Sequence, residues 1–245
     1  MCTVSWLHCD SGYQLFCNRD ERHTRGRAAP PQLHQRAGVR FIAPTDGDHG
    51  GSWIGVNEFG LSLCLLNRYQ DEALQPLQPT VSRGLLLTAL MDSDSPAQVS
   101  CRMKQNELTR FQPFTLLALA IGRPALIIHW TGRELFADSD AEAQMPLTSS
   151  SYETARVVEC RQQQFAGLKQ QAGKITADLL LKFHRSHAPE RGPYSTCMHR
   201  ADAATVSFSR ISIADGVIQF DYHSAAPCTL GAQASRLLKL REHPI

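Results

Sequence analysis

The sequence predicts an α+β fold in which antiparallel strands and paired helices form layers. Short apolar runs rich in β-branched and aromatic residues are separated by Asp, Asn and Gly, which is the pattern of β-hairpins. Between these runs, longer stretches with helix-start signals come in two pairs. The order of strands, two helices, strands, two helices and strands is typical of a layered α+β protein rather than a doubly wound one.

The first half of the chain carries the signals of two hairpins and two helices. Asp10-Ser11-Gly12 and Asn57-Glu58-Phe59-Gly60 each separate two β-rich runs, as hairpin turns do. Ser82 and Ser95 precede helical runs as N-caps, and a proline follows Ser95 at the first helical position. Residues 22–38 are polar and are expected to be a loop. The expected strands are residues 3–9, 13–17, 39–43, 52–56 and 61–66.

The second half of the chain is expected to repeat this order. The apolar runs FTLLALAIG and PALIIHWTG should be buried strands around a Gly-Arg-Pro turn. The stretch MPLTSSSY is expected to be a loop, and residues 152–171 and 176–187 are expected to be helices. The remaining expected strands are residues 194–198, 205–213 and 217–222, the last two joined by Ala214-Asp215-Gly216.

Length and composition favour one globular domain over residues 1–245, because no repeat or linker divides the chain. The net charge of +2, with its basic residues spread, gives no general attraction to nucleic acid, so no nucleic-acid partner is expected. No apolar run approaches the roughly 20 residues of a membrane-spanning helix. The chain also starts without a signal-peptide pattern. We therefore expect a cytoplasmic protein without integral membrane association.

The eight cysteines are expected to be reduced thiols, since no export signal points to an oxidising compartment. His184, His187, Cys197 and His199 form an HxxH pattern followed by CxH. This spacing matches no common zinc motif. The sequence therefore predicts no metal site and no cofactor.

The first hairpin brings Cys2 to the charged run Asn18-Arg19-Asp20-Glu21. If two residues form the turn, Cys2 faces Glu21, and if three residues form it, Cys2 faces Asp20. Directly opposed Cβ atoms lie about 5 Å apart, so we expect the thiol and the charged run to share one small site. The alternative is a small residue beside a solvated loop.

Loss of Met1 would give Cys2 a free α-amino group with a pKa of about 7.7–8.0. One residue would then supply both the nucleophile and the base. Arg19 would favour the thiolate and Asp20 would hold the amine. Exposed at a chain end, Cys2 is expected to be the most reactive of the thiols.

Three motifs carry a resemblance to a known family. The start Met1-Cys2, the run Asn18-Arg19-Asp20-Glu21 and the stretch GGSWIGVNEFGLSLCLLN at 50–67 resemble the Transport and Golgi Organization protein 2 family, also called NRDE-domain proteins. The resemblance implies the four-layer αββα sandwich of N-terminal-nucleophile hydrolases related to choloylglycine hydrolase and penicillin V acylase. It also implies Cys2 as the nucleophile with Arg19 and Asp20 as its neighbours.

Asn67 is a candidate oxyanion donor. If Asn57 pairs with Gly60, Asn67 faces Gly50, where two adjacent glycines permit close backbone approach. An amide at such a strand end can donate to a developing oxyanion, although an asparagine that only ends a strand is the alternative. The related amidases place a second oxyanion asparagine in an LTN context. Here Ser149 stands at that position, so a hydroxyl or a backbone N–H would have to substitute.

Four residues are expected to bind the substrate: Asn18, Glu21, Ser149 and Arg200. Arg200 resembles a substrate-facing arginine of the amidases only loosely, and a surface ion pair is an equal alternative for it. Two functions follow from the resemblance. One is an N-terminal-cysteine hydrolase that cleaves a linear, non-peptide amide through an acyl-thioester. The other is a non-catalytic haem or lipid binding or trafficking protein that uses the same pocket.

We expect Met1 to be removed in the cell, because the Cys2 thiol needs the α-amine of its own residue as base. Intact mass spectrometry of the purified protein checks this, and the mature mass should be lower by one methionine residue. A mature protein that retains Met1 would remove the catalytic hypothesis in its simple form.

Overall fold

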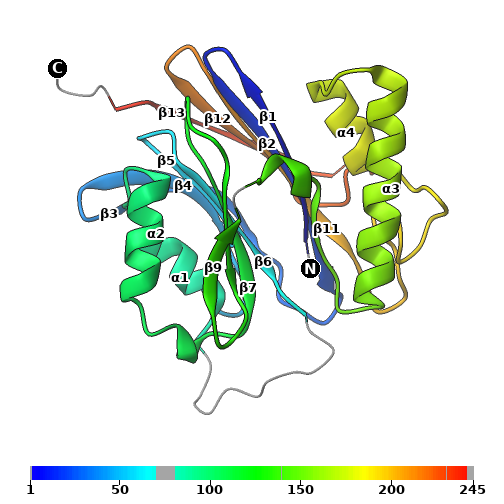
Figure 1. Cartoon of the computed structure of the whole chain (residues 1–245), viewed down its shortest axis with the longest axis horizontal. Helices are drawn as coiled ribbons and strands as arrows, with labels where there is room; N and C mark the ends of the chain where they lie inside the picture. The colour runs from blue at the N-terminus through cyan, green and yellow to red at the C-terminus, as the bar shows by residue number, and fades with distance from the viewer. Residues whose placement is uncertain (1, 70–80, 139, 230, 242–245) are drawn as a thin grey trace.

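Two antiparallel sheets lie face to face between two pairs of helices (Figure 1). The structure, a computed structural model, describes residues 2–69, 81–138, 140–229 and 231–241. Each pair of helices covers the outer face of one sheet. The expected α+β class and the four-layer αββα sandwich are thereby confirmed.

Each sheet is a continuous antiparallel ladder, in which hairpins alternate with longer connections. The six-stranded sheet has the order β10 (Leu147–Ser149), β1 (Cys2–Cys9), β2 (Gly12–Arg22), β11 (Ala203–Ala214), β12 (Val217–His223), β13 (Gln233–Lys239). The seven-stranded sheet has the order β3 (Ala29–Arg36), β4 (Val39–Thr45), β5 (Ile54–Asn57), β6 (Ser62–Asn67), β7 (Phe114–Leu119), β8 (Leu126–Trp130), β9 (Leu135–Asp138). The longer connections lie between neighbours such as β10–β1, β2–β11 and β6–β7.

All four expected helices are present, and each begins within two residues of its expected start. The helices α1 (Arg83–Leu90) and α2 (Pro96–Gln105) pack on the seven-stranded sheet, and α3 (Thr154–Ala172) and α4 (Ala177–Arg185) pack on the six-stranded sheet. Short 3-10 turns lie at Leu108–Arg110 and Glu142–Gln144. The Ser95 hydroxyl caps α2 by accepting from the backbone N–H of Gln98 at 3.2 Å. Ser82 occupies the N-cap position of α1 but makes no capping hydrogen bond with its side chain.

The sequence analysis missed four strands, and all four are the edges of the two sheets: β3, β9, β10 and β13. An edge strand has one neighbour and less buried surface, so it lacks the apolar run that identifies a central strand. Residues 22–38, expected to be a loop, contain β3, and the stretch MPLTSSSY contains β10. The strand expected at 194–198 is wrong. Residues 195–198 of that run are buried, but they form no ladder.

The first hairpin differs from both expected registers. Cys9 pairs with Gly12, so Asp10 and Ser11 form the turn and Cys2 faces Arg19. Gly12 has no positive φ. An added Cβ at Gly12 would lie 2.0 Å from the carbonyl oxygen of Ile213 in β11, so this glycine is required by close strand approach rather than by the turn.

The second hairpin is also shifted by one residue. Asn57 donates to the carbonyl of Leu61, and Gly60 closes a three-residue turn with φ +74°. Such a turn is a common hairpin connection with a left-handed residue at its end. Asn67 therefore does not face Gly50. It pairs with Phe114 of β7.

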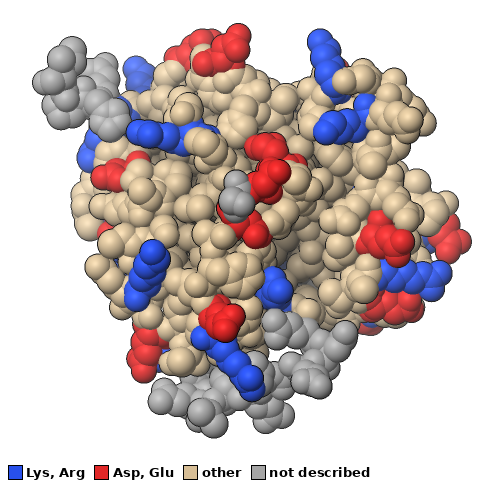
Figure 2. All heavy atoms as spheres, viewed as in Figure 1, with Lys and Arg blue, Asp and Glu red and all other residues tan. Residues whose placement is uncertain are grey.

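Two buried layers hold the sandwich together. The strand β7 sends Phe114 and Leu116 toward the core beneath α1 and α2, and Leu117 and Leu119 toward the core between the sheets. Burial on both faces explains why its sequence is a continuous apolar run. None of the described helices has the length and apolar character needed to span a membrane. On the face in Figure 2, Lys and Arg side chains are scattered without forming a continuous patch.

Gly12→Ala is expected to lower the free energy of unfolding by about 1–3 kcal/mol, because the new methyl group overpacks against β11. The matched control is Gly167→Ala in α3, where nothing lies within 4 Å of the added Cβ. The control is expected to raise stability by about 0.5–1 kcal/mol. Chemical denaturation measures both values, and equal stability of the two variants would contradict this account of Gly12.

Candidate active site

Cys2 lies in the first position of β1, between two neighbouring strands. It pairs with Arg19 of β2 on one side and with Ser149 of β10 on the other. Directly opposed residues of antiparallel strands point to the same face of a sheet. Cys2, Arg19 and Ser149 therefore form a row across the end of the six-stranded sheet, which we call the Cys2 row.

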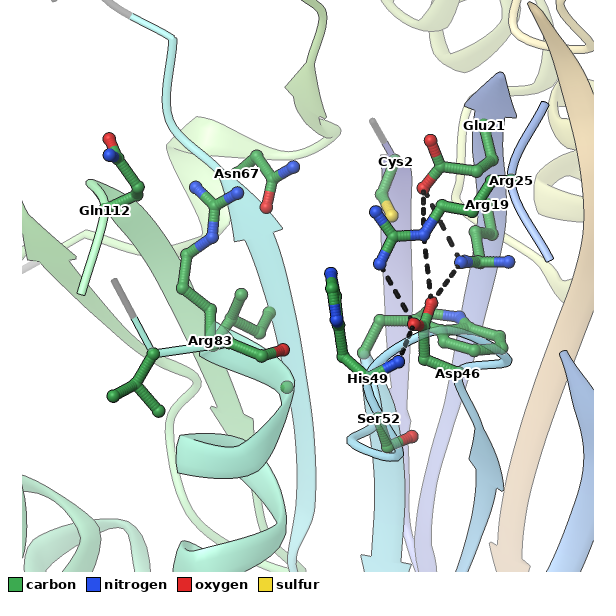
Figure 3. Close-up of a pocket in the computed structure, with 15 residues that line it drawn as sticks. Cys2, Arg19, Glu21, Arg25, Asp46, His49, Ser52, Asn67, Arg83 and Gln112 are labelled. Atoms are coloured by element: carbon green, nitrogen blue, oxygen red, sulfur yellow. Dashed lines mark hydrogen bonds and ion pairs between the residues drawn. The ribbon is translucent and has the colours of Figure 1, made fainter. Parts of the chain in front are cut away.

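A cavity of about 310 Å³ opens beside this row (Figure 3). Cys2, Arg19 and Glu21 form the wall contributed by the six-stranded sheet, and Asn67 lies in the wall contributed by the other sheet. The structure thus brings together four of the predicted site residues. Asn18, Asp20, Ser149 and Arg200 do not line this cavity.

Arg19 is held in place by partners that the sequence analysis did not identify. Its guanidinium donates to Asp46 at 2.7 Å and lies 4.3 Å from the centre of the Trp53 ring. Arg25 binds the other oxygen of Asp46 at 2.9 Å. Asp46 lies in a polar stretch after β4 that carries no recognisable motif. Only the folded chain brings it to Arg19.

The charge of Asp46 is stabilised by this cluster. Burial alone would raise the pKa of the Asp46 carboxyl, but the hydrogen bond and charge of Arg25 outweigh it. The backbone N–H of His49 and the charge of Arg19 act in the same direction. The pKa of Asp46 is therefore lower than usual, and the carboxylate remains a fixed counter-charge for both arginines.

Asn18 and Asp20 point to the opposite face of β2, toward the helices. Asp20 accepts from Arg161 of α3 at 3.2 Å and from Thr205 of β11 at 2.6 Å. Asn18 donates to the carbonyls of His184 and Thr196. Successive residues of a strand alternate between faces, so Asn18 and Asp20 do not line the cavity with Cys2, although the charge of Asp20 contributes to the raised pKa of the Cys2 thiol.

His184 belongs to this helix-facing network and not to the other histidines. It contacts the Ser5 hydroxyl at 2.8 Å and the Asn18 side chain at 3.0 Å. Burial, followed by the charge of Arg161, lowers the pKa of His184 to about 3. The ring is therefore neutral at physiological pH and serves as a hydrogen-bonding core residue.

The Cys2 thiol is buried, with 4% of the residue exposed, which corrects the expectation of an exposed chain end. A hydrogen bond with Cys17, followed by burial, raises the pKa of Cys2 well above its usual value. Cys17 in turn lies 3.9 Å from Cys64, sulfur to sulfur. The thiol needs a base before it can attack an electrophile. Met1, whose removal would expose the α-amine of Cys2, lies outside the described residues.

Ser149 and Asn67 are the two candidate oxyanion donors. Within the described part of the chain, the buried Ser149 hydroxyl has no hydrogen-bond partner. Ser149 and Asn67 together line a second cavity of about 390 Å³, and Asn67 also lines the first. The Asn67 amide donates to the Tyr69 hydroxyl at 3.0 Å. Asn67 therefore lies between the two cavities.

Arg83 is a cavity residue that the sequence analysis missed. It is the first residue of α1, and Figure 3 shows it with Asn67 across the cavity from Cys2 and Arg19. Its guanidinium donates to the carbonyl of Pro113 at 2.9 Å, and burial lowers its pKa. Among the described residues, no carboxylate lies within ion-pair distance of Arg83. The sequence places Arg83 directly after the helix N-cap Ser82, a position that does not indicate a binding role.

Arg200 lies away from both cavities. It forms an ion pair with Asp202 at 2.8 Å, and its guanidinium lies 4.5 Å from the centre of the Tyr152 ring. This arrangement agrees with the alternative of an ion-pairing residue. A role of Arg200 in substrate binding stays a prediction.

The motif residues in the turn of the second hairpin make structural contacts. The Asn57 side chain donates to the carbonyls of Met91 and Ser93. Glu58 is buried and forms ion pairs with Arg40 at 2.6 Å and Arg241 at 2.9 Å. These contacts attach the turn to α1 and to the end of the chain rather than to the cavity.

Comparisons with known proteins agree with this fold. The family profile described as Transport and Golgi organisation 2 matches residues 1–200. No curated protein sequence matches the chain. Penicillin V acylase from Agrobacterium tumefaciens is 10% identical with a TM-score of 0.56, over 92% of this chain and 83% of that one.

Two further solved structures are similar over nearly their whole length. A mutant of conjugated bile acid hydrolase from Clostridium perfringens is 12% identical with a TM-score of 0.53, over 99% of this chain and 97% of that one. A Caenorhabditis elegans N-acylethanolamine-hydrolyzing acid amidase ortholog is 11% identical with a TM-score of 0.57, over 94% of each chain. At these identities the likeness shows the N-terminal-nucleophile hydrolase fold alone.

Asp46→Asn is expected to destabilise the protein at neutral pH, and the difference from wild type should shrink in acid. Because the folded pKa of Asp46 is depressed, its contribution is present above the unfolded value of 3.8 and is lost as the pH falls through the folded value. Denaturant unfolding across this pH range measures the difference. The control is Asp10→Asn in the exposed first turn, and a pH-independent difference for Asp46→Asn would contradict the proposed ion pairs.

Proposed function

The chain belongs to the Transport and Golgi organisation 2 family, and we propose that it is an N-terminal-cysteine amidohydrolase. Its substrate is a small molecule with a linear, non-peptide C–N amide bond, cleaved in the cytoplasm through an acyl-thioester. The observation that carries this proposal is the Cys2 row beside a cavity. The three similar structures, named as an acylase, a hydrolase and an amidase, support the same reaction class.

The first half of the reaction uses Cys2 as nucleophile and base. After Met1 is removed, the α-amine of Cys2 accepts the proton of its own thiol, and the thiolate attacks the amide carbonyl carbon. The tetrahedral intermediate then breaks its C–N bond. The leaving amine takes the proton back from the α-ammonium group, and the acyl group remains on sulfur as a thioester.

Water completes the reaction. The α-amine accepts a proton from a water molecule, whose oxygen attacks the thioester carbonyl carbon. The C–S bond breaks, the sulfur regains the proton, and the acyl group leaves as a carboxylic acid. Each turnover therefore consumes one water and restores the free thiol and the free amine.

Ser149 supplies an oxyanion donor in place of the asparagine found in related amidases. Its buried hydroxyl is adjacent to Cys2 in the ladder and free of other partners within the described residues. A donor placed at the developing negative charge is typically worth about 10²–10³-fold in rate. Asn67 is the second donor, and it must exchange its contact with Tyr69 for the substrate.

The charges in the cavity favour a substrate with a carboxylate near the amide. Arg19 and Arg25 share the two carboxylates of Asp46 and Glu21, whereas Arg83 has no carboxylate partner among the described residues. Arginine pairs well with carboxylates because its guanidinium donates two parallel hydrogen bonds. An N-acyl amino acid fits these requirements. The same charged walls are less suited to a neutral lipid, whereas the propionate groups of haem can pair with Arg83 as an acyl amino acid does.

Cys2→Ala is expected to reduce hydrolysis of N-acyl amino acids by at least about 10³-fold, because it removes the nucleophile and leaves the cavity nearly unchanged. Ser149→Ala should reduce kcat by about 10²–10³-fold. The matched control is Cys101→Ala, which changes an exposed thiol of α2 and should keep full activity. Amine release from a panel of acyl chain lengths measures all four proteins.

The same preparations test the alternative function by haem absorbance. If no acyl amino acid is hydrolysed while haem binds and is lost in Cys2→Ala, the hydrolase proposal is wrong and Cys2 is an axial ligand. Asp20→Asn is not a suitable catalytic probe. It leaves the buried Arg161 without its counter-charge, so it is expected to destabilise the fold whatever the function.

A further inference from the structure

Four potential metal ligands meet away from the candidate active site: His187, Cys197, His199 and Cys228. The ligand atoms of these residues all lie within 4.8 Å of one another. His187 follows α4, Cys197 and His199 lie in the connection from α4 to β11, and Cys228 follows β12. We call this group the His2Cys2 cluster.

We propose that the His2Cys2 cluster binds one zinc ion with tetrahedral geometry. In a tetrahedral site with Zn–N of about 2.0–2.1 Å and Zn–S of about 2.3 Å, two nitrogens lie about 3.3–3.4 Å apart, and a nitrogen and a sulfur about 3.5–3.6 Å apart. The Nε2 atoms of His187 and His199 are 3.3 Å apart. The sulfurs of Cys197 and Cys228 lie 3.6 Å and 3.4 Å from Nε2 of His199. The three contacts of His199 are therefore spaced as zinc requires, and the other ligand pairs lie within 4.8 Å.

The ligand chemistry selects zinc among the common divalent ions. Two thiolates and two imidazoles are a typical structural zinc set, whereas magnesium and calcium prefer oxygen ligands. Binding releases the two thiol protons to solvent, and the resulting charges of the ion and the thiolates cancel. Four protein ligands leave no open position for a substrate, so the site is structural.

The cysteines bind zinc as thiolates, so the ion takes the place of the thiol proton of Cys197 and of Cys228. Arg191 donates toward Nδ1 of His199 at 3.4 Å. A histidine bound through Nε2 keeps its proton on Nδ1, so the exposed Arg191 side chain turns away when the ion binds.

The sequence did not reveal this site because its ligands come from separate segments. The HxxH and CxH pattern in the sequence contained His184, whose side chain in the structure contacts Ser5 and Asn18 instead. The fourth member of the His2Cys2 cluster is Cys228, which lies about thirty residues downstream of His199 on a different connection. No common zinc spacing describes that set.

The zinc site supports the strand that carries Arg19. The loop between its ligands contributes Thr196, whose carbonyl accepts from Asn18. The same loop contributes Met198, whose backbone N–H donates to Thr205, and Thr205 donates to Asp20. Fixing this loop to the segment after β12 therefore stabilises the helix-facing side of β2.

Elemental analysis of the full-length protein, reduced and supplied with zinc during purification, tests the proposal. Wild type is expected to hold about one zinc per chain. Cys228→Ala should bind zinc more than about 100-fold more weakly, because loss of an outer-shell partner alone costs 10–100-fold. Cys101→Ala is the matched control and should hold zinc as wild type does. Circular dichroism confirms that each variant folds.

Cobalt(II) replacing zinc gives a second readout that does not depend on activity. Wild type should show the intense visible bands of tetrahedral cobalt with thiolate charge-transfer bands, and Cys228→Ala should lack them. Cys2→Ala should keep both metals, so failure of the hydrolase proposal leaves this one intact. The proposal would be overturned by any of three results. These are wild type that binds neither zinc nor cobalt, a Cys197–Cys228 disulfide that persists in the reduced protein, or full zinc content in Cys228→Ala.

Discussion

The alternation of side chains along β2 is the constraint on which the rest of the site depends. This strand is paired on both edges, with β1 and β11, and buried on both faces. Its odd-numbered residues Cys17, Arg19 and Glu21 therefore face the cavity side, and the intervening Asn18 and Asp20 face the helices. The charged run at residues 18–21 is therefore divided between two networks, one that lines the cavity and one that binds the helices.

The helix-facing network holds the layers in register. Asp20 and Arg161 are almost completely buried and bind each other at 3.2 Å, and Arg161 also donates to Thr3 of β1. A buried charge that loses its partner typically costs about 3–5 kcal/mol. This pair therefore fixes α3 over the β1–β2 hairpin, and it places Cys2 and Arg19 without taking part in the cavity. Asp20, the motif residue next to Arg19, thus positions the site without lining the cavity.

Much of the fold could be predicted from the sequence, because central strands and capped helices have strong local patterns. The β1–β2 hairpin, β4, β7, β8 and all four helices follow from apolar runs and from N-caps such as Ser95. The edge strands could not be predicted, since they carry polar residues and depend on one neighbour. The predicted hairpin registers were wrong by one or two residues. Gly12 is required by the close approach of β11 rather than by the turn, and Gly60 ends a three-residue turn instead of a two-residue one.

The site was predictable where a residue lies on the same hairpin as Cys2 or matches the family resemblance, and not where partners come from distant segments without a motif. Arg19 and Ser149 follow from the hairpin and from the resemblance, whereas Asp46, Arg83 and Arg161 carry no motif. The same is true of Cys228, which only the fold brings to the two histidines. Long-range packing decides these contacts, and a single sequence does not encode them in any local pattern.

The claim that Cys2 is the nucleophile is tested most directly by trapping the acyl-enzyme. Mature protein is mixed with an N-acyl amino acid that it hydrolyses, quenched in acid within the first turnover and mapped by peptide mass spectrometry. The account predicts that the mass of the acyl group appears on the peptide that begins with Cys2 and disappears after hydroxylamine treatment. Two results would contradict it. One is turnover with the acyl group on another residue, and the other is turnover without a covalent intermediate together with full activity of Cys2→Ala.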